Sequence, residues 1–263
     1  MSELQNKVAL VTGASQGIGR AIALRLARAG AGIALVAMND SHLGNTFQEM
    51  KDMGVRVLRY GVDLTDDHEL EQMAHEVLGD WGSIDILVNN AGIGGPTAPI
   101  HEMPVEGWDR TLAINLRAPF LLSRILAPGM IKQKGGKIIN MSSIAGKMAY
   151  PLRTPYAASK WALIGLTLTV AQELGSSNIQ VNAICPGPTE TELIESVIRA
   201  RAEAVGTDYE TMSKEYVKAT ALKRMVQPEE VADLVHFLCS PAASAITGQA
   251  IDISAGYGFR IGD

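Results

Sequence analysis

Three side chains in the second half of the chain have the types and the spacing of a proton-transfer centre. Tyr156 and Lys160 are four residues apart in a predicted helix, so their side chains lie on one face, about one turn apart. A tyrosine hydroxyl ordinarily titrates at about 10, and a neighbouring ammonium favours the phenolate, which predicts a lowered pKa for Tyr156. Ser143 ends a predicted strand, where its hydroxyl could hydrogen-bond a substrate oxygen that becomes negatively charged. Together they predict acid–base chemistry on a hydroxyl or carbonyl group.

A glycine-rich turn near the N-terminus predicts a phosphate-binding loop. The apolar run 7–11 predicts a buried strand, the turn 12–19 follows at once, and a helix begins at Gly17. Glycines let the backbone turn sharply and let a pyrophosphate approach the free N–H groups of the helix N-terminus. A strand before and a helix after the turn are the context that a dinucleotide site requires, although the G-x-x-x-G-x-G spacing differs from the common fingerprint.

A proline marks another position of interest, in the helix predicted at 104–131. Pro119 has no N–H, so the carbonyl of Asn115, four residues earlier, loses its intrahelical partner. We expect a kink and a free carbonyl at this point. That carbonyl could hold a water beside Lys160 and extend the proton path to solvent. A kink that only adapts helix packing would leave the same pattern.

Buried strands alternate with helices along the chain. Strands are predicted at 7–11, 33–37, 55–59, 84–88, 137–141, 179–184 and 249–253, and helices at 17–29, 41–53, 66–79, 104–131 and 156–174. Apolar strands joined by helices indicate a parallel sheet covered on both sides. We therefore predict an α/β, doubly wound (Rossmann-type) fold in a single domain, residues 1–263. Charged and Met-rich helical pieces interrupt the alternation at about 188–223, and we interpret them as a substrate flap.

The composition excludes several other classes of protein. Lys and Arg number 23 against 28 Asp and Glu, and the net charge of −5 provides no basic stripe for nucleic acid. No apolar run approaches the ~18 residues of a membrane span, and the N-terminus has no basic region or cleavage-like site of a signal peptide. The two cysteines form no disulfide framework and the five histidines show no metal-binding spacing. We expect a cytoplasmic protein without a metal site.

Several motifs, in order along the chain, resemble the short-chain dehydrogenase/reductase family in its single-domain branch. Residues 89–92 match its NNAG and residues 156–160 its YxxxK, with Ser143 thirteen residues before the tyrosine. Asn115 matches a fourth active-site residue, and residues 186–191 match PGxxxT. Asp63 with Leu64 matches the family's adenine-side aspartate. The matches run from residue 7 to the last predicted strand.

The resemblance implies an NAD(P)-dependent oxidoreductase that interconverts a secondary alcohol and a ketone. It implies that Tyr156 is the general acid/base, that Ser143 steadies the substrate oxygen, and that Asn115 belongs to the catalytic set. Lys160 would lower the Tyr156 pKa and hold the nicotinamide ribose. The cofactor-binding residues that it implies are Gly13, Ser15, Gln16, Gly17, Ile18, Gly19, Asn39, Asp63, Leu64, Asn90, Ala91, Gly92, Tyr156, Lys160, Pro186, Gly187, Thr189 and Thr191. Relatives commonly form tetramers, so a homotetramer is implied as well.

The chain has neither the residue that usually selects NAD in this family nor the residues that usually select NADP. NAD-preferring relatives usually end the second strand with Asp, and this chain has Ala37 there. NADP-preferring relatives usually carry Arg or Lys where this chain has Met38 and Gln16. Asn39 and Asp40 follow, and the charge of Asp40 would repel a 2′-phosphate. NAD is therefore the expected cofactor, with NADP as the alternative.

The substrate is indicated by a single residue. Arg153 lies between Pro151 and Pro155, three residues before Tyr156. An arginine held there could bind a carboxylate, sulfonate or phosphate with a bidentate fork, although a salt bridge or an intersubunit contact would also explain it. We expect a small polar or anionic substrate, such as a hydroxy acid or a polyol. The alternatives are an NADPH-dependent 3-oxoacyl thioester reductase and, from another class, a non-catalytic dinucleotide-sensing protein.

Overall fold

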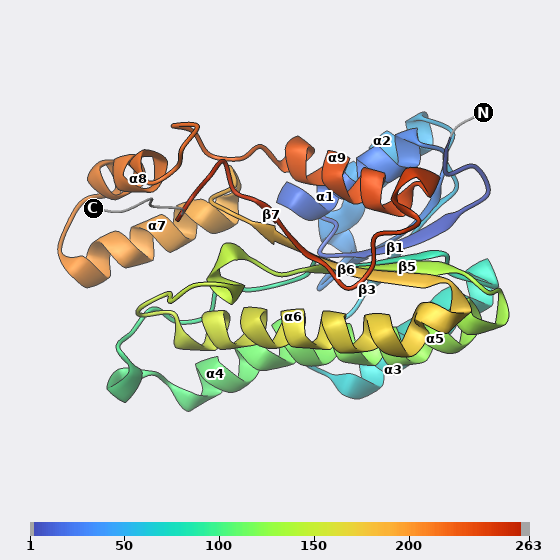
Figure 1. Cartoon of the computed structure of the whole chain (residues 1–263), viewed down its shortest axis with the longest axis horizontal. Coiled ribbons are helices and arrows are strands. Elements are labelled where there is room, and N and C mark those ends of the chain that lie inside the picture. The colour runs from blue at the N-terminus through green and yellow to red at the C-terminus, as the bar shows by residue number, and fades with distance from the viewer. Residues whose placement is uncertain (1–2, 259–263) are drawn as a thin grey trace.

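Seven parallel strands form one sheet in the computed structural model, which describes residues 3–258 (Figure 1). The strand order is β3-β2-β1-β4-β5-β6-β7, so the order reverses between β1 and β4. The strands are β1 Val8–Thr12, β2 Gly32–Ala37, β3 Val57–Gly61, β4 Ile86–Asn89, β5 Gly136–Met141, β6 Ile179–Pro186 and β7 Ala250–Ile253. This topology confirms the prediction of a doubly wound α/β fold.

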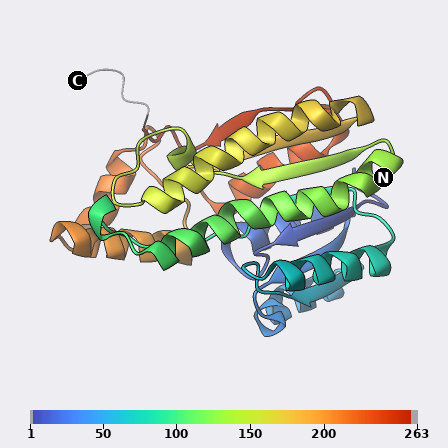
Figure 2. The ribbon, with the colours of Figure 1, turned by 90° about the horizontal axis from the view of Figure 1, so that it is seen from below.

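Helices cover both faces of the sheet (Figures 1 and 2). One face carries α1 Gly17–Arg28, α2 Gly44–Asp52 and α9 Pro228–Cys239. The other carries α3 Asp67–Trp81, α4 Val105–Leu112, α5 Ala118–Lys132 and α6 Thr154–Leu174. Each face buries its own apolar core. The sequence analysis did not name α9, although Pro228 at its first turn and a capping box between Gln227 and Glu230 mark its start.

The helix predicted at 104–131 is divided into α4 and α5. Between them, residues 113–117 form a π-helical turn, in which the N–H of Ala118 donates to the carbonyl of Ala113, five residues back. Pro119 lies at the start of α5 and supplies no N–H to Asn115. The expected interruption therefore takes the form of a widened turn, a feature that often occurs at functional sites.

The segment expected to form a flap contains two helices, α7 Glu192–Val205 and α8 Tyr209–Lys218. They project beyond the end of the sheet, next to the C-terminal end of the described chain (Figure 1). Ile198, Tyr216 and Met225 form a small apolar cluster there, separate from the two main cores. None of the helices in the described part of the chain has the length and apolar character needed to cross a membrane.

Candidate active site

A cavity of about 630 Å³ opens at the carboxyl ends of the strands, where the strand order reverses. Its walls come from the loops after β1, β4, β5 and β6 and from one side of α7. Doubly wound folds bind their ligands at this point, because the loops on the two sides of the reversal diverge there. The motifs that the sequence analysis singled out converge on this cavity.

The glycine-rich turn has the backbone geometry of an anion site. Gly13 and Gly17 have φ angles of +65° and +53°, in the left-handed region that favours glycine. A Cβ on Gly13 would lie 2.9 Å from Ala91 Cα, and one on Gly19 would overlap the Gly13 carbonyl. Among the described residues no side chain caps α1, and its first turn has no acidic residue. The helix N-terminus therefore keeps its N–H groups and its positive dipole end for a pyrophosphate.

The first loop is fixed to the loop after β4. The N–H groups of Asn90 and Ala91 both donate to Thr12 Oγ1 at 3.0 Å, and Asn90 Nδ2 donates to the Thr12 carbonyl at 2.9 Å. These bonds join the ends of two neighbouring strands into one rigid wall. From the two loops, the predicted cofactor residues that line the cavity are Gly13, Ser15, Gln16, Gly17, Ile18, Gly19, Asn90, Ala91 and Gly92.

Ser143, Tyr156 and Lys160 meet on the opposite wall of the cavity. Ser143 follows β5, and its hydroxyl accepts a hydrogen bond from the Ala145 N–H at 3.1 Å. Lys160 Nζ lies 5.6 Å from the centroid of the Tyr156 ring. The spacing of four residues on α6 thus places both side chains on one helix face, as predicted.

The pKa of Tyr156 differs from the expectation. Burial raises the Tyr156 pKa, while the Ser143 hydrogen bond and the positive charge of Arg153 act to lower it. The Lys160 ammonium instead donates to the Met141 carbonyl at 2.7 Å, and burial lowers the Lys160 pKa to about 8. The prediction of a Tyr156 pKa lowered by Lys160 is therefore wrong for the polypeptide alone. The Tyr156 pKa is raised because desolvation destabilises the phenolate more than Ser143 and the Arg153 charge stabilise it.

Asn115 is fully buried and uses its side chain as a clamp. Its Oδ1 accepts from the Ile93 N–H at 2.9 Å, and its Nδ2 donates to the Ile93 carbonyl at 3.0 Å and to Ser159 Oγ at 3.1 Å. Ser159 Oγ in turn donates to the Tyr156 carbonyl at 2.8 Å. The side chain therefore connects the loop after β4 to α6 beside the tyrosine. Sequence reasoning considered only the Asn115 carbonyl, and no local pattern indicates this clamp.

The chain is similar to known proteins over nearly its whole length. A family model described as enoyl-(acyl carrier protein) reductase matches residues 13–258. Over 253 residues the chain is 37% identical to the 3-oxoacyl-(acyl-carrier-protein) reductase FabG of Thermotoga maritima, with 96% of this chain and 98% of the relative covered. The chain belongs to the short-chain dehydrogenase/reductase family. It is accordingly an oxidoreductase that acts on CH–OH groups.

Two solved structures of short-chain dehydrogenases/reductases agree with the fold. An NAD⁺-bound xylitol dehydrogenase superposes with a TM-score of 0.93 at 34% identity, covering 97% of this chain and 100% of the other. The L-sorbose reductase of Gluconobacter frateurii, solved with NADPH and L-sorbose, superposes with a TM-score of 0.91 at 33% identity, covering 99% and 100%. Relatives of nearly equal similarity thus bind different nicotinamide dinucleotides.

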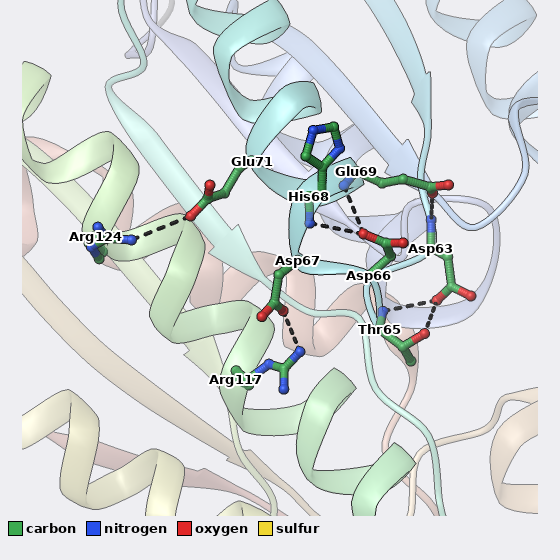
Figure 3. A network of polar contacts seen from close by, with 9 residues as sticks. All are labelled: Asp63, Thr65, Asp66, Asp67, His68, Glu69, Glu71, Arg117 and Arg124. Carbon is green, nitrogen blue, oxygen red and sulfur yellow. Dashed lines mark hydrogen bonds and ion pairs between the residues drawn. The ribbon is translucent and has the colours of Figure 1, made fainter.

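In the segments that follow β2 and β3 of this short-chain dehydrogenase/reductase, two of the predicted cofactor residues have side chains that are hydrogen-bonded to near neighbours. Asn39 Oδ1 accepts from the Ser41 N–H and hydroxyl, both at 3.0 Å. Asp63 Oδ1 accepts from the Thr65 N–H at 2.9 Å and hydroxyl at 2.8 Å, which holds the Asp63 pKa below its usual value (Figure 3). Neither Asn39 nor Asp63 is among the residues that line the cavity, whereas Leu64 is.

Other side chains from the end of β2 and the segment after it line the cavity instead. Ala37, Met38 and His42 border the cavity, and the sequence analysis did not assign Met38 or His42 to the cofactor. Asp40, expected to repel a 2′-phosphate, forms an ion pair with Arg59 Nε at 2.8 Å. The signal that could have identified His42 is its position in the short helical turn after β2, Asp40–Leu43.

The segment after β6 leads from the cavity into the flap. Pro186, Gly187, Thr189 and Thr191 all line the cavity, and Thr191 caps α7 by accepting from the Ile194 N–H at 3.3 Å. Three further tyrosines line the cavity, of which the first was expected at the rim of the active site and the other two were not predicted. They are Tyr150, Tyr216 and Tyr257. They come from three separate segments, so no spacing in the sequence connects them.

Proposed function

We propose that the chain interconverts a secondary alcohol and a ketone on a small polar or anionic substrate, with Tyr156 as general acid/base and a nicotinamide dinucleotide as cofactor. The observation that carries this proposal is that Ser143, Tyr156 and Lys160 lie in one cavity opposite the glycine-rich turn. The glycine-rich turn fits the group, because Gly13 and Gly17 adopt positive φ and the N-terminus of α1 has no side-chain cap and no acidic residue in its first turn. When bound, the dinucleotide supplies the centre that accepts or donates the hydride.

The chain's own residues handle the proton and the charge. Tyr156 gives a proton to the substrate oxygen in reduction, or removes it in oxidation. Ser143 stabilises the negative charge that develops on the same oxygen, because its hydroxyl group borders the same cavity as Tyr156. Lys160, held at the Met141 carbonyl beside the tyrosine, is positioned to bind the nicotinamide ribose. Asn115 completes the set by fixing the loop after β4 to α6.

NAD is the cofactor that we propose, with NADP as the alternative. Arg59 neutralises part of the Asp40 charge, but a carboxylate at this position still disfavours a phosphate. A paired fluorescence titration with NADH and NADPH tests the choice, and tighter binding of NADH is expected. Tighter binding of NADPH would contradict it and favour 3-oxoacyl thioester reduction, the activity in the name of the Thermotoga maritima relative.

The test of the enzyme proposal follows that titration. Oxidation of short hydroxy acids and polyols with the oxidised form of the dinucleotide that binds more tightly, followed as absorbance of the reduced nicotinamide that forms, should reveal turnover. Binding of a dinucleotide without turnover of any hydroxyl or keto substrate would favour a sensing protein. Binding of neither dinucleotide would overturn the enzyme proposal.

We also propose a homotetramer. Large apolar side chains are exposed on the long helices, with Phe120 on α5 and both Trp161 and Leu168 on α6. Their exposed fractions of 45%, 53% and 45% are large for apolar residues and fit burial between subunits. Light scattering after size-exclusion chromatography should give four times the chain mass of 28.0 kDa, and a mass near 28 kDa would contradict the proposal.

A further inference from the structure

Arg153 is a buried cation in the wall of the cavity. It immediately precedes α6, is only 3% exposed, and its guanidinium carbon lies 5.5 Å from the centroid of the Tyr156 ring. Removing a charged group from water costs several kcal/mol unless an opposite charge or several hydrogen bonds compensate. An arginine with this burial therefore needs a partner.

The polypeptide supplies only part of what this guanidinium needs. Nε and Nη2 both donate to the Gly94 carbonyl, at 3.1 Å and 2.6 Å. None of the ion pairs in the described part of the chain includes Arg153. A guanidinium has five N–H groups in a fixed fork, so the bonds to Gly94 leave the Nη1–Nη2 end, which can grip an anion through two parallel bonds.

Among the described residues, no carboxylate forms an ion pair with the Arg153 guanidinium. The hydroxyls of Tyr150 and Tyr216 lie 3.2 Å apart and share a hydrogen bond with each other. Glu192 is the acidic residue among those that line the cavity, and it makes no ion pair with Arg153. Gly94 holds the guanidinium in place through its carbonyl, which accepts two of the N–H groups. Arg153 Nη2 packs so closely on Gly94 that a Cβ at this position would overlap it. The guanidinium is therefore positively charged, held by the Gly94 carbonyl, and packed against the ring that carries the proposed reacting hydroxyl.

We propose that Arg153 binds an anionic group of the substrate, which identifies the substrate as a short hydroxy or keto acid rather than a neutral polyol or sugar. This inference rests on the proposed function, because Tyr156 fixes where the reacting carbon must lie. The anion is bound a few ångströms from that carbon, since the guanidinium packs against the Tyr156 ring. Carboxylate, sulfonate and phosphate share the required chemistry.

The first experiment measures binding and does not depend on turnover. The purified protein with saturating NADH is titrated with butyrate, propane-1-sulfonate or propyl phosphate, with butyramide as the neutral counterpart, at constant ionic strength. Thermal unfolding reports the affinity. At least one anion should raise Tm in the wild type, and Arg153→Met should weaken its binding about 10- to 100-fold, the range for hydrogen bonds to charged groups. The anion with the largest shift identifies the class.

Three further variants make this result specific. Arg199→Met removes one positive charge from α7, where Arg199 is exposed and stacks on Tyr209, and it should bind the anions as the wild type does. Gly94→Ala keeps the Arg153 charge but displaces the guanidinium, so it should weaken binding as Arg153→Met does. Arg153→Lys should recover only part of the affinity, because an ammonium has no bidentate fork.

A kinetic experiment then tests selectivity. Acetoacetate and pentane-2,4-dione differ only in a carboxylate or an acetyl group at the same position, so their kcat/KM ratio with NADH isolates the charge. Arg153→Met should lower that ratio at least about 10-fold. Tyr156→Phe separates the two proposals, because it should abolish reduction of both ketones yet leave anion binding intact.

Two outcomes would overturn the inference. In the first, no anion raises the Tm of the wild type by more than it raises the Tm of Arg153→Met. In the second, Arg153→Met slows both ketones equally, which would leave Arg153 as a residue that only positions or charges the Tyr156 region. Loss of turnover with anion binding retained would contradict the proposed function alone.

Discussion

The two ends of the cavity are built by different means. At the phosphate end, the contacts come from the backbone, with glycines at φ values of +65° and +53° and N–H groups at the start of α1. At the substrate end, they come from side chains on the loop before α6, on the flap and near the C-terminal end of the described chain. The backbone site can be recognised from the spacing of a few glycines, whereas the side-chain site depends on elements far apart in the sequence.

The difference also determines what each end can discriminate. A backbone cradle binds any pyrophosphate, because it contacts a group that all dinucleotides share. Side chains such as Arg153 and Tyr150, which line the cavity, are the kind of group that discriminates the shape and charge of a substrate. Substitutions at the phosphate end should therefore affect every reaction of the protein equally, and those at the substrate end should affect selectivity.

The largest effect is expected at the reacting centre. Tyr156→Phe removes the proton donor and should lower kcat about 1,000-fold, within the range of general acid–base catalysis. The Kd for NADH should change little, because the phosphate end is intact. Stopped-flow absorbance and fluorescence titration measure the two quantities.

Tyr60→Phe is the matched control for the loss of one tyrosine hydroxyl. Tyr60 lies on β3, and its hydroxyl donates to Asp80 at 2.8 Å, away from the cavity. We expect kcat within about 2-fold of the wild type. If Tyr156→Phe retained full activity, the proton would have to come from another group and the proposed role would fail.

A backbone change should break the phosphate end. Gly13→Ala places a Cβ at positive φ and 2.9 Å from Ala91 Cα, and such strain costs about 1–3 kcal/mol. The Kd for NADH should rise at least about 10-fold, and the free energy of unfolding should fall, as measured by titration and urea denaturation. Gly79→Ala on exposed α3, where a Cβ meets nothing within 4 Å, should instead stabilise the protein by up to about 1 kcal/mol. Equal effects of the two substitutions would contradict the cradle.

The sequence predicted the fold more completely than the site. Seven apolar runs and the glycine-rich turn were enough for the sheet, because buried parallel strands and a helix N-terminus are local patterns. β3 was expected at 55–59 and lies at Val57–Gly61, because Val55 still donates to the Met50 carbonyl at the end of α2. Spacing also placed Tyr156 and Lys160 correctly on one helix face.

Long-range contacts account for what the sequence could not predict. The Asn115 clamp joins residues 22 and 44 positions away, and the direction of the Tyr156 pKa shift depends on burial by the whole fold. At Asn39 a local contact, rather than a long-range one, was not foreseen. Asn39 was expected to bind the cofactor, and its Oδ1 accepts from the Ser41 N–H two residues away, because asparagine side chains readily bond the backbone of a local turn.

The protonation of Lys160 should appear in the pH dependence of stability. Its pKa is about 8 in the folded chain against 10.5 for the unfolded reference, so the unfolded state binds more protons between these values. Stability therefore rises with pH across this window, whereas below about pH 8 both states are protonated and the contribution is flat. Between pH 7 and 9.5, the wild type should gain about 2 kcal/mol relative to Lys160→Met.

Urea denaturation of both proteins without added cofactor measures this difference. The buried thiols Cys185 and Cys239 have raised pKa values and act in the opposite direction over the same window. The Cys239 contribution cancels because both proteins contain this thiol, whereas Cys185 interacts with Lys160 itself, so the comparison is repeated in a Cys185→Ala background. Parallel stability curves for the wild type and Lys160→Met would show that the Lys160 ammonium is not destabilised by burial.

The smallest effect is expected where side chains enter the otherwise backbone-built cofactor end. Asp40→Asn removes the carboxylate that pairs with Arg59 at 2.8 Å and releases the guanidinium near the adenosine end. Both changes favour a 2′-phosphate, but the pair is partly exposed and screened by solvent, so NADPH should bind only about 3-fold more tightly. The affinity for NADH should stay the same, because NADH carries an uncharged 2′-hydroxyl where NADPH carries the phosphate.

Asp52→Asn makes this small effect interpretable. Asp52 ends α2, is exposed, and has the same charge, and it contacts Gln48 rather than the cavity. If Asp52→Asn tightened NADPH binding as much as Asp40→Asn does, the cause would be the net charge of the protein and not a specific contact. An increase confined to Asp40→Asn, and abolished by 0.5 M salt, would show that selectivity at the cofactor end depends on side chains even though binding there depends on the backbone.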